Sequence, residues 1–285
     1  MVGAPCIWVV MEGERRSMSE QSNVAEVDRG VWVYAIGRAD HAAERAASLC
    51  GVAGEQVRAV VAGDLAAAVG TVDLEEFRGA RLRRTFEDAD AFAPKARAHN
   101  AIVSAFRRGG PVIPVRLGTI YRDDRRVSQL LLNEHDDMVA ALRRVSGRDE
   151  LGVKAYADPR SLALQGDLIN SAATDTLSRV PHLLRRRRQL AALQEGYQLA
   201  SAEADRVHAV LLRCAVDGKR KPPSEEHSTN KGPWTLLNGS YLVEKDGIGL
   251  FRETLTALER STARIRLEVT GPWPPYSFAD DLVAI

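Results

Sequence analysis

Few side chains in this sequence have the type and spacing that catalysis or metal binding requires. The run Glu134-His-Asp-Asp137 offers carboxylate and imidazole groups of the kind that bind metal ions. Neighbouring residues of a helix point in different directions, however, so these four cannot converge on one ion. We interpret them as a solvated surface. None of the six histidines pairs with another at a helical ligand spacing, so we expect neither a metal site nor an organic cofactor.

Three isolated residues are the remaining candidates for a reaction centre. His99 lies on the apolar side of a predicted helix, where a hydrogen-bonded core histidine is more common than a catalytic one. Arg116 alternates with apolar residues and would need a carboxylate or carbonyl partner if it is partly buried. Lys154, like Glu150 before it, fits a structural ion pair. An alternative function would use Arg116, Lys154 and His99 to bind or transform a small ligand in a cleft between two domains.

The usual signatures of enzymes and nucleic-acid-binding proteins are missing. The chain has no Gly-x-Gly-x-x-Gly, no phosphate loop, no His-Glu-x-x-His and no Gly-x-Ser-x-Gly. The four arginines Arg185–Arg188 would surround a helix as a collar, and no strand carries aromatic residues arranged to stack bases. The sequence therefore favours a protein that is not an enzyme and that does not bind nucleic acid.

The first half predicts the element order β-α-β-β-α-β, which is typical of ferredoxin-like folds. Apolar periodicity and turn residues indicate strands over 31–36, 57–61, 65–69 and 112–120, helices over 41–50 and 88–108, and a helical pair over 123–145.

The second half predicts another α+β unit. Its elements are strands over 151–157, 236–243 and 264–269, helices over 181–214 and 248–260, and a flexible polar loop over 217–233. The long helix carries apolar residues at heptad spacing, namely Leu190, Leu193, Tyr197, Ala200, Ala204, Val207 and Leu211. We favour packing of this seam on the domain's own sheet, and packing on another helix is the alternative.

These elements predict an α+β protein of two domains, each with a ferredoxin-like β-α-β-β-α-β tendency. The expected parts are a disordered leader over 1–29, an N-terminal α+β domain over 30–148 and a C-terminal ferredoxin-like α+β domain over 149–285. The last domain contains the heptad-patterned helix and ends in an aromatic and proline-rich tail.

The tail, Thr270-Gly-Pro-Trp-Pro-Pro-Tyr-Ser-Phe278, is the most informative stretch of the chain. Its prolines hold the segment extended and leave little chain entropy. The favoured interpretation is that the aromatic residues cap their own domain's core, with Trp273 in the core and Phe278, beyond the last proline, as an exposed anchor. The alternative is a docking site for a partner, because rigid aromatic side chains are frequent anchors. Trp273, Tyr276, Phe278 and Arg116 are the candidate partner-binding residues.

Composition restricts the function further. The 285 residues are 45% apolar and 27% charged, with a formal net charge of +1, so no global field selects nucleic acid or an anionic membrane. Three cysteines without Cys-x-x-Cys spacing fit a reducing compartment. With no segment that could span a membrane, we expect a soluble cytoplasmic protein.

The tail resembles the C-terminal signature of the gas vesicle protein GvpL/GvpF family. Four further stretches resemble that family in the expected order: Val31-Trp-Val-Tyr-Ala-Ile36, Val112-Ile-Pro-Val-Arg-Leu-Gly-Thr119, Glu150-Leu-Gly-Val-Lys154 and Leu237-Asn-Gly-Ser-Tyr-Leu-Val243. The resemblance covers about residues 30 to 280. Leu117, Leu151 and Ser240 depart from the usual residues in side-chain size rather than in chemistry.

The resemblance implies a function that composition and spacing do not show. It implies a cytoplasmic accessory or minor structural protein of gas vesicles, which assists nucleation and assembly of the shell. Its partners would be the hydrophobic shell protein and other gas vesicle accessory proteins.

Overall fold

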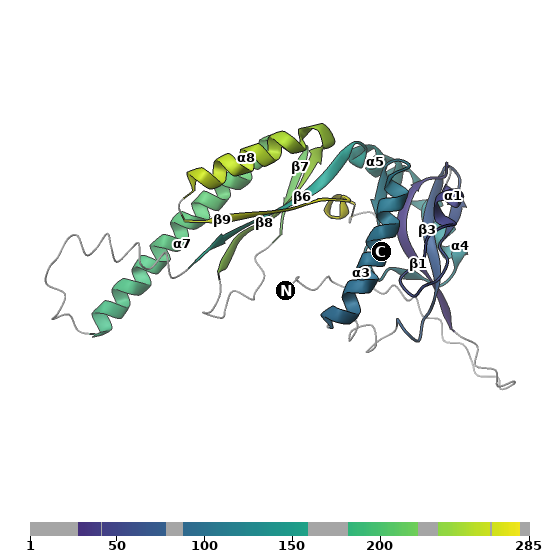
Figure 1. Ribbon diagram of the computed structural model, residues 1–285, viewed down its shortest axis with the longest axis horizontal. Coiled ribbons are helices and arrows are strands. Elements are labelled where there is room, and N and C mark those ends of the chain that lie inside the picture. The colour runs from purple at the N-terminus through teal and green to yellow at the C-terminus, as the bar shows by residue number, and fades with distance from the viewer. Residues whose placement is uncertain are drawn as a thin grey trace. The chain divides into compact units, whose positions relative to one another are not determined.

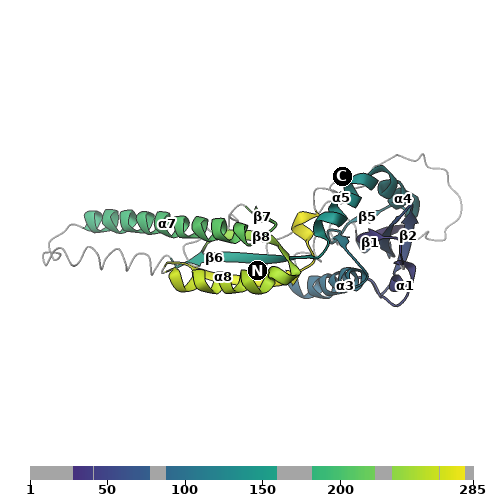
Figure 2. The same ribbon diagram turned by 90° about the horizontal axis from the view of Figure 1, so that it is seen from above.

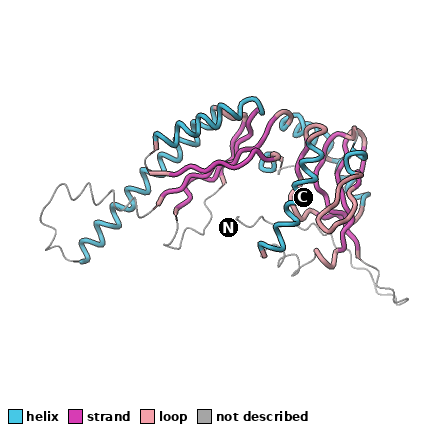
Figure 3. The backbone as a smooth tube through the Cα atoms, viewed as in Figure 1, coloured by secondary structure: helices cyan, strands magenta, loops and turns pink. Residues whose placement is uncertain are grey.

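The computed structural model of the chain describes residues 28–40, 42–77, 88–158, 182–221, 233–262 and 264–279, which form helices and antiparallel sheets (Figure 1, Figure 3). They belong to two compact units. The first combines the chain up to Gly147 with the chain from Pro274 onward, and the second is Arg148–Trp273. The chain therefore returns to the first unit at its C-terminal end, which differs from the continuous domain predicted over 149–285. Of the predicted leader, 1–27 lie outside the described residues.

The first unit is built on an antiparallel sheet with the strand order β2-β3-β1-β4, in which β5 also pairs with β1. The strands are β1 (Arg29–Arg38), β2 (Arg58–Ala62), β3 (Leu65–Asp73), β4 (Val112–Pro114) and β5 (Ile120–Tyr121). The central place of β1 follows from its sequence, because Val31 to Ile36 are apolar throughout and buried. The predicted strand over 112–120 is interrupted, since the chain turns at Gly118, whose φ is +92°.

Helices cover both faces of the first sheet. They are α1 (Ala42–Ala46), α3 (Ala89–Arg107), α4 (Asp124–Asn133) and α5 (His135–Val145). The Asp88 side chain begins α3 by accepting hydrogen bonds from the backbone amides of Asp90 and Ala91. Alternate residues of β1 enter different cores: Trp32 packs with α1 and α3, and Val33 packs with α4 and α5.

The second unit has a four-stranded antiparallel sheet with the order β7-β8-β6-β9. Its elements are β6 (Arg148–Ala157), α7 (His182–Arg213), β7 (Asp217–Arg220), β8 (Trp234–Glu244), α8 (Ile248–Ser261) and β9 (Arg266–Trp273). Both helices pack on one face, where Val153 of β6, Val207 of α7 and Phe251 of α8 share a core. No helix among the described residues is long and apolar enough to cross a lipid bilayer.

Two predictions about this unit need adjustment. Residues 217–220 were expected in a flexible loop but form β7, because this polar segment pairs with Leu242 to Gly239 of β8 as an edge strand; the rest of that loop, 222–232, lies outside the described residues. The seam of α7 is fully buried only in its C-terminal half. There Ala200, Ala204, Val207 and Leu211 are buried, whereas Leu190 and Tyr197 remain 58% and 43% exposed.

Candidate functional site

The C-terminal segment, residues 274–279, packs on the core of the first unit. It contains a short 3-10 turn, η4 (Tyr276–Phe278). The Tyr276 hydroxyl donates a 2.6 Å hydrogen bond to the Asn100 side-chain oxygen, and its ring centre lies 6.4 Å from that of His99. Phe278 and Ala279 are buried. The segment is therefore an integral part of the first unit.

The expected roles of two aromatic residues in this stretch were wrong. Phe278 was expected to be exposed but retains only 3% of its surface, whereas Trp273 was expected in the core and is 50% exposed. The reason is that the chain passes from the second unit to the first between Trp273 and Pro274. Trp273 is the last residue of β9 in the second unit, and the chain joins the first unit at Pro274.

The four predicted partner-binding residues therefore have different environments. Tyr276 and Phe278 are held by the first unit, and Trp273 presents half of its side chain to solvent at the end of β9. Arg116 is half-buried in the loop between β4 and β5, where its carbonyl accepts a 2.8 Å hydrogen bond from the Thr119 hydroxyl. These observations leave Trp273 as the accessible aromatic residue of the set.

His99 is a core histidine, as predicted. It is 1% exposed, its Nδ1 accepts a 3.2 Å hydrogen bond from the Trp32 indole, and its Nε2 donates a 2.9 Å hydrogen bond to the Val115 carbonyl. Burial penalises the charged ring and lowers the pKa of His99 to about 4. Because both nitrogens are engaged and the ring is neutral, His99 is unsuited to the catalytic role that the alternative function assigned to it.

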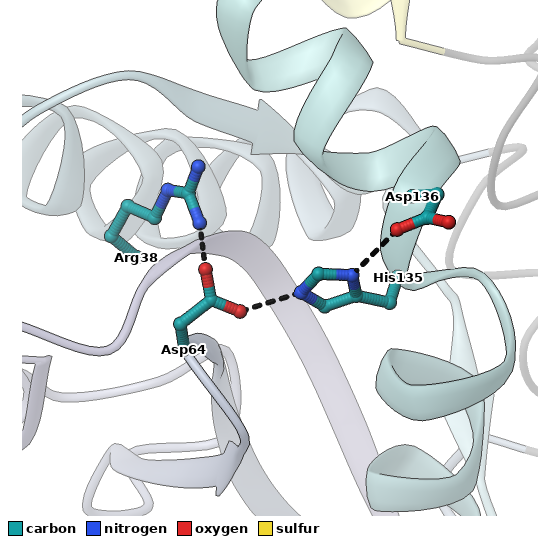
Figure 4. A network of polar contacts seen from close by, with 4 residues as sticks. All are labelled: Arg38, Asp64, His135 and Asp136. Atoms are coloured by element: carbon teal, nitrogen blue, oxygen red, sulfur yellow. Dashed lines mark hydrogen bonds and ion pairs between the residues drawn. The ribbon is translucent and has the colours of Figure 1, made fainter.

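A polar network that the sequence did not reveal joins three elements of the first unit (Figure 4). Asp64, in the β2–β3 turn, forms an ion pair with Arg38 and accepts a 2.6 Å hydrogen bond from Nε2 of His135 at the start of α5. The other ring nitrogen of His135 lies 3.0 Å from an Asp136 carboxylate oxygen. Hydrogen bonds to Asp136 and then Asp64 raise the pKa of His135, and His135 in turn lowers the pKa of Asp64.

This network, the Asp64–His135 clamp, lies at the surface, because the side chains of Arg38, Asp64 and His135 are 36%, 54% and 37% exposed. It borders an open depression of about 380 Å³ lined by residues 132–137. Across the described part of the chain, no group of three or more His, Cys, Asp or Glu side chains could hold a metal ion. Asp64 and His135 are 71 residues apart. The sequence therefore drew attention to the run Glu134–Asp137 without indicating Asp64 as the partner of His135.

Known proteins resemble this chain over most of its length. Residues 30–280 match the sequence profile of the gas vesicle synthesis protein GvpL/GvpF family. Gas vesicle protein L of Streptomyces sp. (strain CB03234) is 38% identical over 254 residues, which cover 88% of this chain and 93% of that protein. The chain belongs to the GvpL/GvpF family.

Other GvpL/GvpF relatives agree with this assignment. Gas vesicle protein F of the same Streptomyces strain is 29% identical over 87% of this chain and 99% of its own length. The crystal structure of the gas vesicle protein GvpF from Anabaena sp. PCC7120 shares the fold, with a TM-score of 0.61, 15% sequence identity, and coverage of 88% of this chain and 96% of that one. The resemblance inferred from five short stretches is thereby confirmed over most of the chain.

Proposed function

We propose that this protein is a non-enzymatic accessory or minor structural protein of gas vesicles, which assists nucleation and assembly of the shell from the cytoplasm. The observation that carries the proposal is the family match, which extends over residues 30–280 and therefore includes both units. Its partners would be the hydrophobic shell protein and other gas vesicle accessory proteins.

We further propose that both units are ferredoxin-like. Each follows the chain order β-α-β-β-α-β, with the pair α4 and α5 added to the first unit. Renumbered within its unit, each sheet has the strand order 2-3-1-4, and every pair is antiparallel. Two units of the same topology support an origin as a structural repeat.

The physical role of such a protein is to protect an aggregation-prone subunit. A very hydrophobic shell protein exposes apolar surface and unpaired strands before it joins the wall, and such surfaces associate non-specifically. A soluble protein can shield them reversibly by offering a sheet edge, an aromatic anchor or a groove. Among the described residues, β9 is an edge strand of the second sheet and ends at the half-exposed Trp273.

A direct binding measurement tests this proposal. Immobilised full-length chain should bind purified gas vesicle shell protein, or another gas vesicle accessory protein, saturably and with one stoichiometry. Trp273→Ala should weaken a contact made at the β9 edge, with Tyr276→Phe as the control because Tyr276 belongs to the first unit's core. Absence of binding to every gas vesicle protein of the same cell would contradict the proposed function.

The alternative of ligand binding or catalysis by Arg116, Lys154 and His99 has less support. His99 is sealed in the core with both nitrogens hydrogen-bonded. The relatives named above are gas vesicle proteins by name.

A further inference from the structure

The first turns of α7 extend beyond the sheet on which the rest of the helix packs. Figure 1 and Figure 2 both show its first turns passing the ends of the strands. From His182 to Leu199 the helix measures about 27 Å at a rise of 1.5 Å per residue. The first fully buried residue of α7 among those described is Ala200.

The N-terminal half of α7 keeps the apolar seam of the helix. Leu190 and Tyr197 are 58% and 43% exposed, and Leu193 between them is partly buried. At 100° per residue these three lie within about 60° of one another, on the side that the buried residues Ala200 and Ala204 continue. Leu193 also packs against the core of the second unit, and the Tyr197 ring lies edge-on to that of Trp234 in β8, with centroids 5.3 Å apart. The seam is thus only partly covered here, and Leu190 and part of Tyr197 face solvent.

The spacing of the seam indicates what could cover it. Apolar residues at heptad spacing present knobs and holes to another helix. A partner strand could not add to this surface by main-chain pairing, because the backbone groups of a helix are already bonded within it. The matching element is therefore an amphipathic helix.

The basic residues of this face of α7 indicate which kind of helix could bind to it. Exposed Arg186 lies on the same side as Leu190, exposed Arg187 lies beside it, and both belong to the run Arg185–Arg188. A parallel second copy of this chain would place these basic turns against each other, which is repulsive. An acidic helix from a different protein complements the surface better.

We propose that the face of α7 formed by Arg186, Leu190, Leu193 and Tyr197 is a docking surface for an acidic amphipathic helix of another gas vesicle protein. This inference rests on the proposed function and adds to it a surface and the chemistry of the partner. The helix would lie along α7, with its apolar stripe on the leucines and its carboxylates near the arginines.

Two leucines of α7 provide a matched test. Leu190→Glu places a charge in the proposed surface, and Leu199→Glu makes the same change nine residues later, about 180° away on the opposite side of the helix. Leu199 is 44% exposed, close to Leu190. Glutamate has a high helix propensity, so both variants should keep α7 and melt like the wild type.

The full-length wild type and variants are measured against each purified gas vesicle protein of the same cell, the shell protein included, by biolayer interferometry. For the partner that binds wild type, Leu190→Glu should raise Kd at least about tenfold, as loss of an interface anchor does, and Leu199→Glu should change it less than about twofold. Replacing both Arg186 and Arg187 by glutamate reverses their charge and should also weaken binding. Added salt should weaken the wild-type complex.

Each other outcome overturns the inference in a recognisable way. Equal Kd values for wild type and Leu190→Glu, or equal losses for Leu190→Glu and Leu199→Glu, would exclude this face while leaving the proposed function in place. A wild-type dimer that Leu190→Glu dissociates in sedimentation velocity would identify a second copy as the occupant. No binding of wild type to any gas vesicle protein would remove the proposed function and this inference together.

Discussion

Replacing Phe278 by alanine tests whether the C-terminal segment is part of the first unit's core. Phe278 is 3% exposed, and truncating a buried phenylalanine costs about 3–5 kcal/mol of unfolding free energy. Trp273, five residues earlier, is 50% exposed. Its side chain buries roughly 100 Å², half of a typical aromatic area, so Trp273→Ala should cost at most about 2.5 kcal/mol.

The two substitutions should also act on different units. Phe278 belongs to the first unit and Trp273 to the second. Urea unfolding followed by far-UV circular dichroism gives the loss of unfolding free energy. Hydrogen exchange measured by mass spectrometry shows which unit has been destabilised. Phe278→Ala should speed exchange in β1 and α3, whereas Trp273→Ala should speed it in β6 and β9. The reasoning fails if Phe278→Ala leaves the first unit within about 0.5 kcal/mol of wild type, or if Trp273→Ala costs more than Phe278→Ala.

Three further predictions use the same urea assay. Tyr276→Phe removes the hydrogen bond to Asn100 and should cost about 0.5–1.5 kcal/mol; no loss would mean that water replaces the bond. Because the pKa of His99 is about 4 when folded and near 6.5 when unfolded, the unfolded chain takes up the proton first, so stability should fall by about 2 kcal/mol from pH 7 to pH 5. His99→Gln should lack that component, and equal pH profiles would contradict it. Gly51→Ala directs a methyl group at the Glu55 carboxylate and the Tyr34 hydroxyl bonded to it and should cost about 1–3 kcal/mol; a variant as stable as wild type would contradict this.

Elements with a strong local pattern could be predicted from the sequence. The apolar run of β1 indicated a central strand, and the periodicity of α3 placed His99 on its buried side. The heptad spacing of α7 was also visible, although only half of its seam is buried. In each case the pattern reports which side is apolar, whereas burial depends on how far the neighbouring sheet extends.

Features that depend on distant contacts could not be predicted. The polar segment that forms β7 has no strand pattern, because a half-buried edge strand needs no apolar alternation. The clamp of Asp64 and His135 joins residues 71 positions apart. The burial of Phe278 depends on the chain crossing to the first unit after Trp273, and the prolines indicate a rigid segment without indicating the core on which it packs.

A sedimentation assay can decide whether this chain binds the gas vesicle shell protein and keeps it soluble, as we propose. Purified shell protein is diluted from denaturant into buffer alone, into buffer with equimolar full-length chain, or into buffer with an unrelated soluble protein of similar size. We expect the shell protein to remain in the supernatant, in a complex with this chain, only in the second case. Equal amounts of pelleted shell protein in all three cases would contradict it.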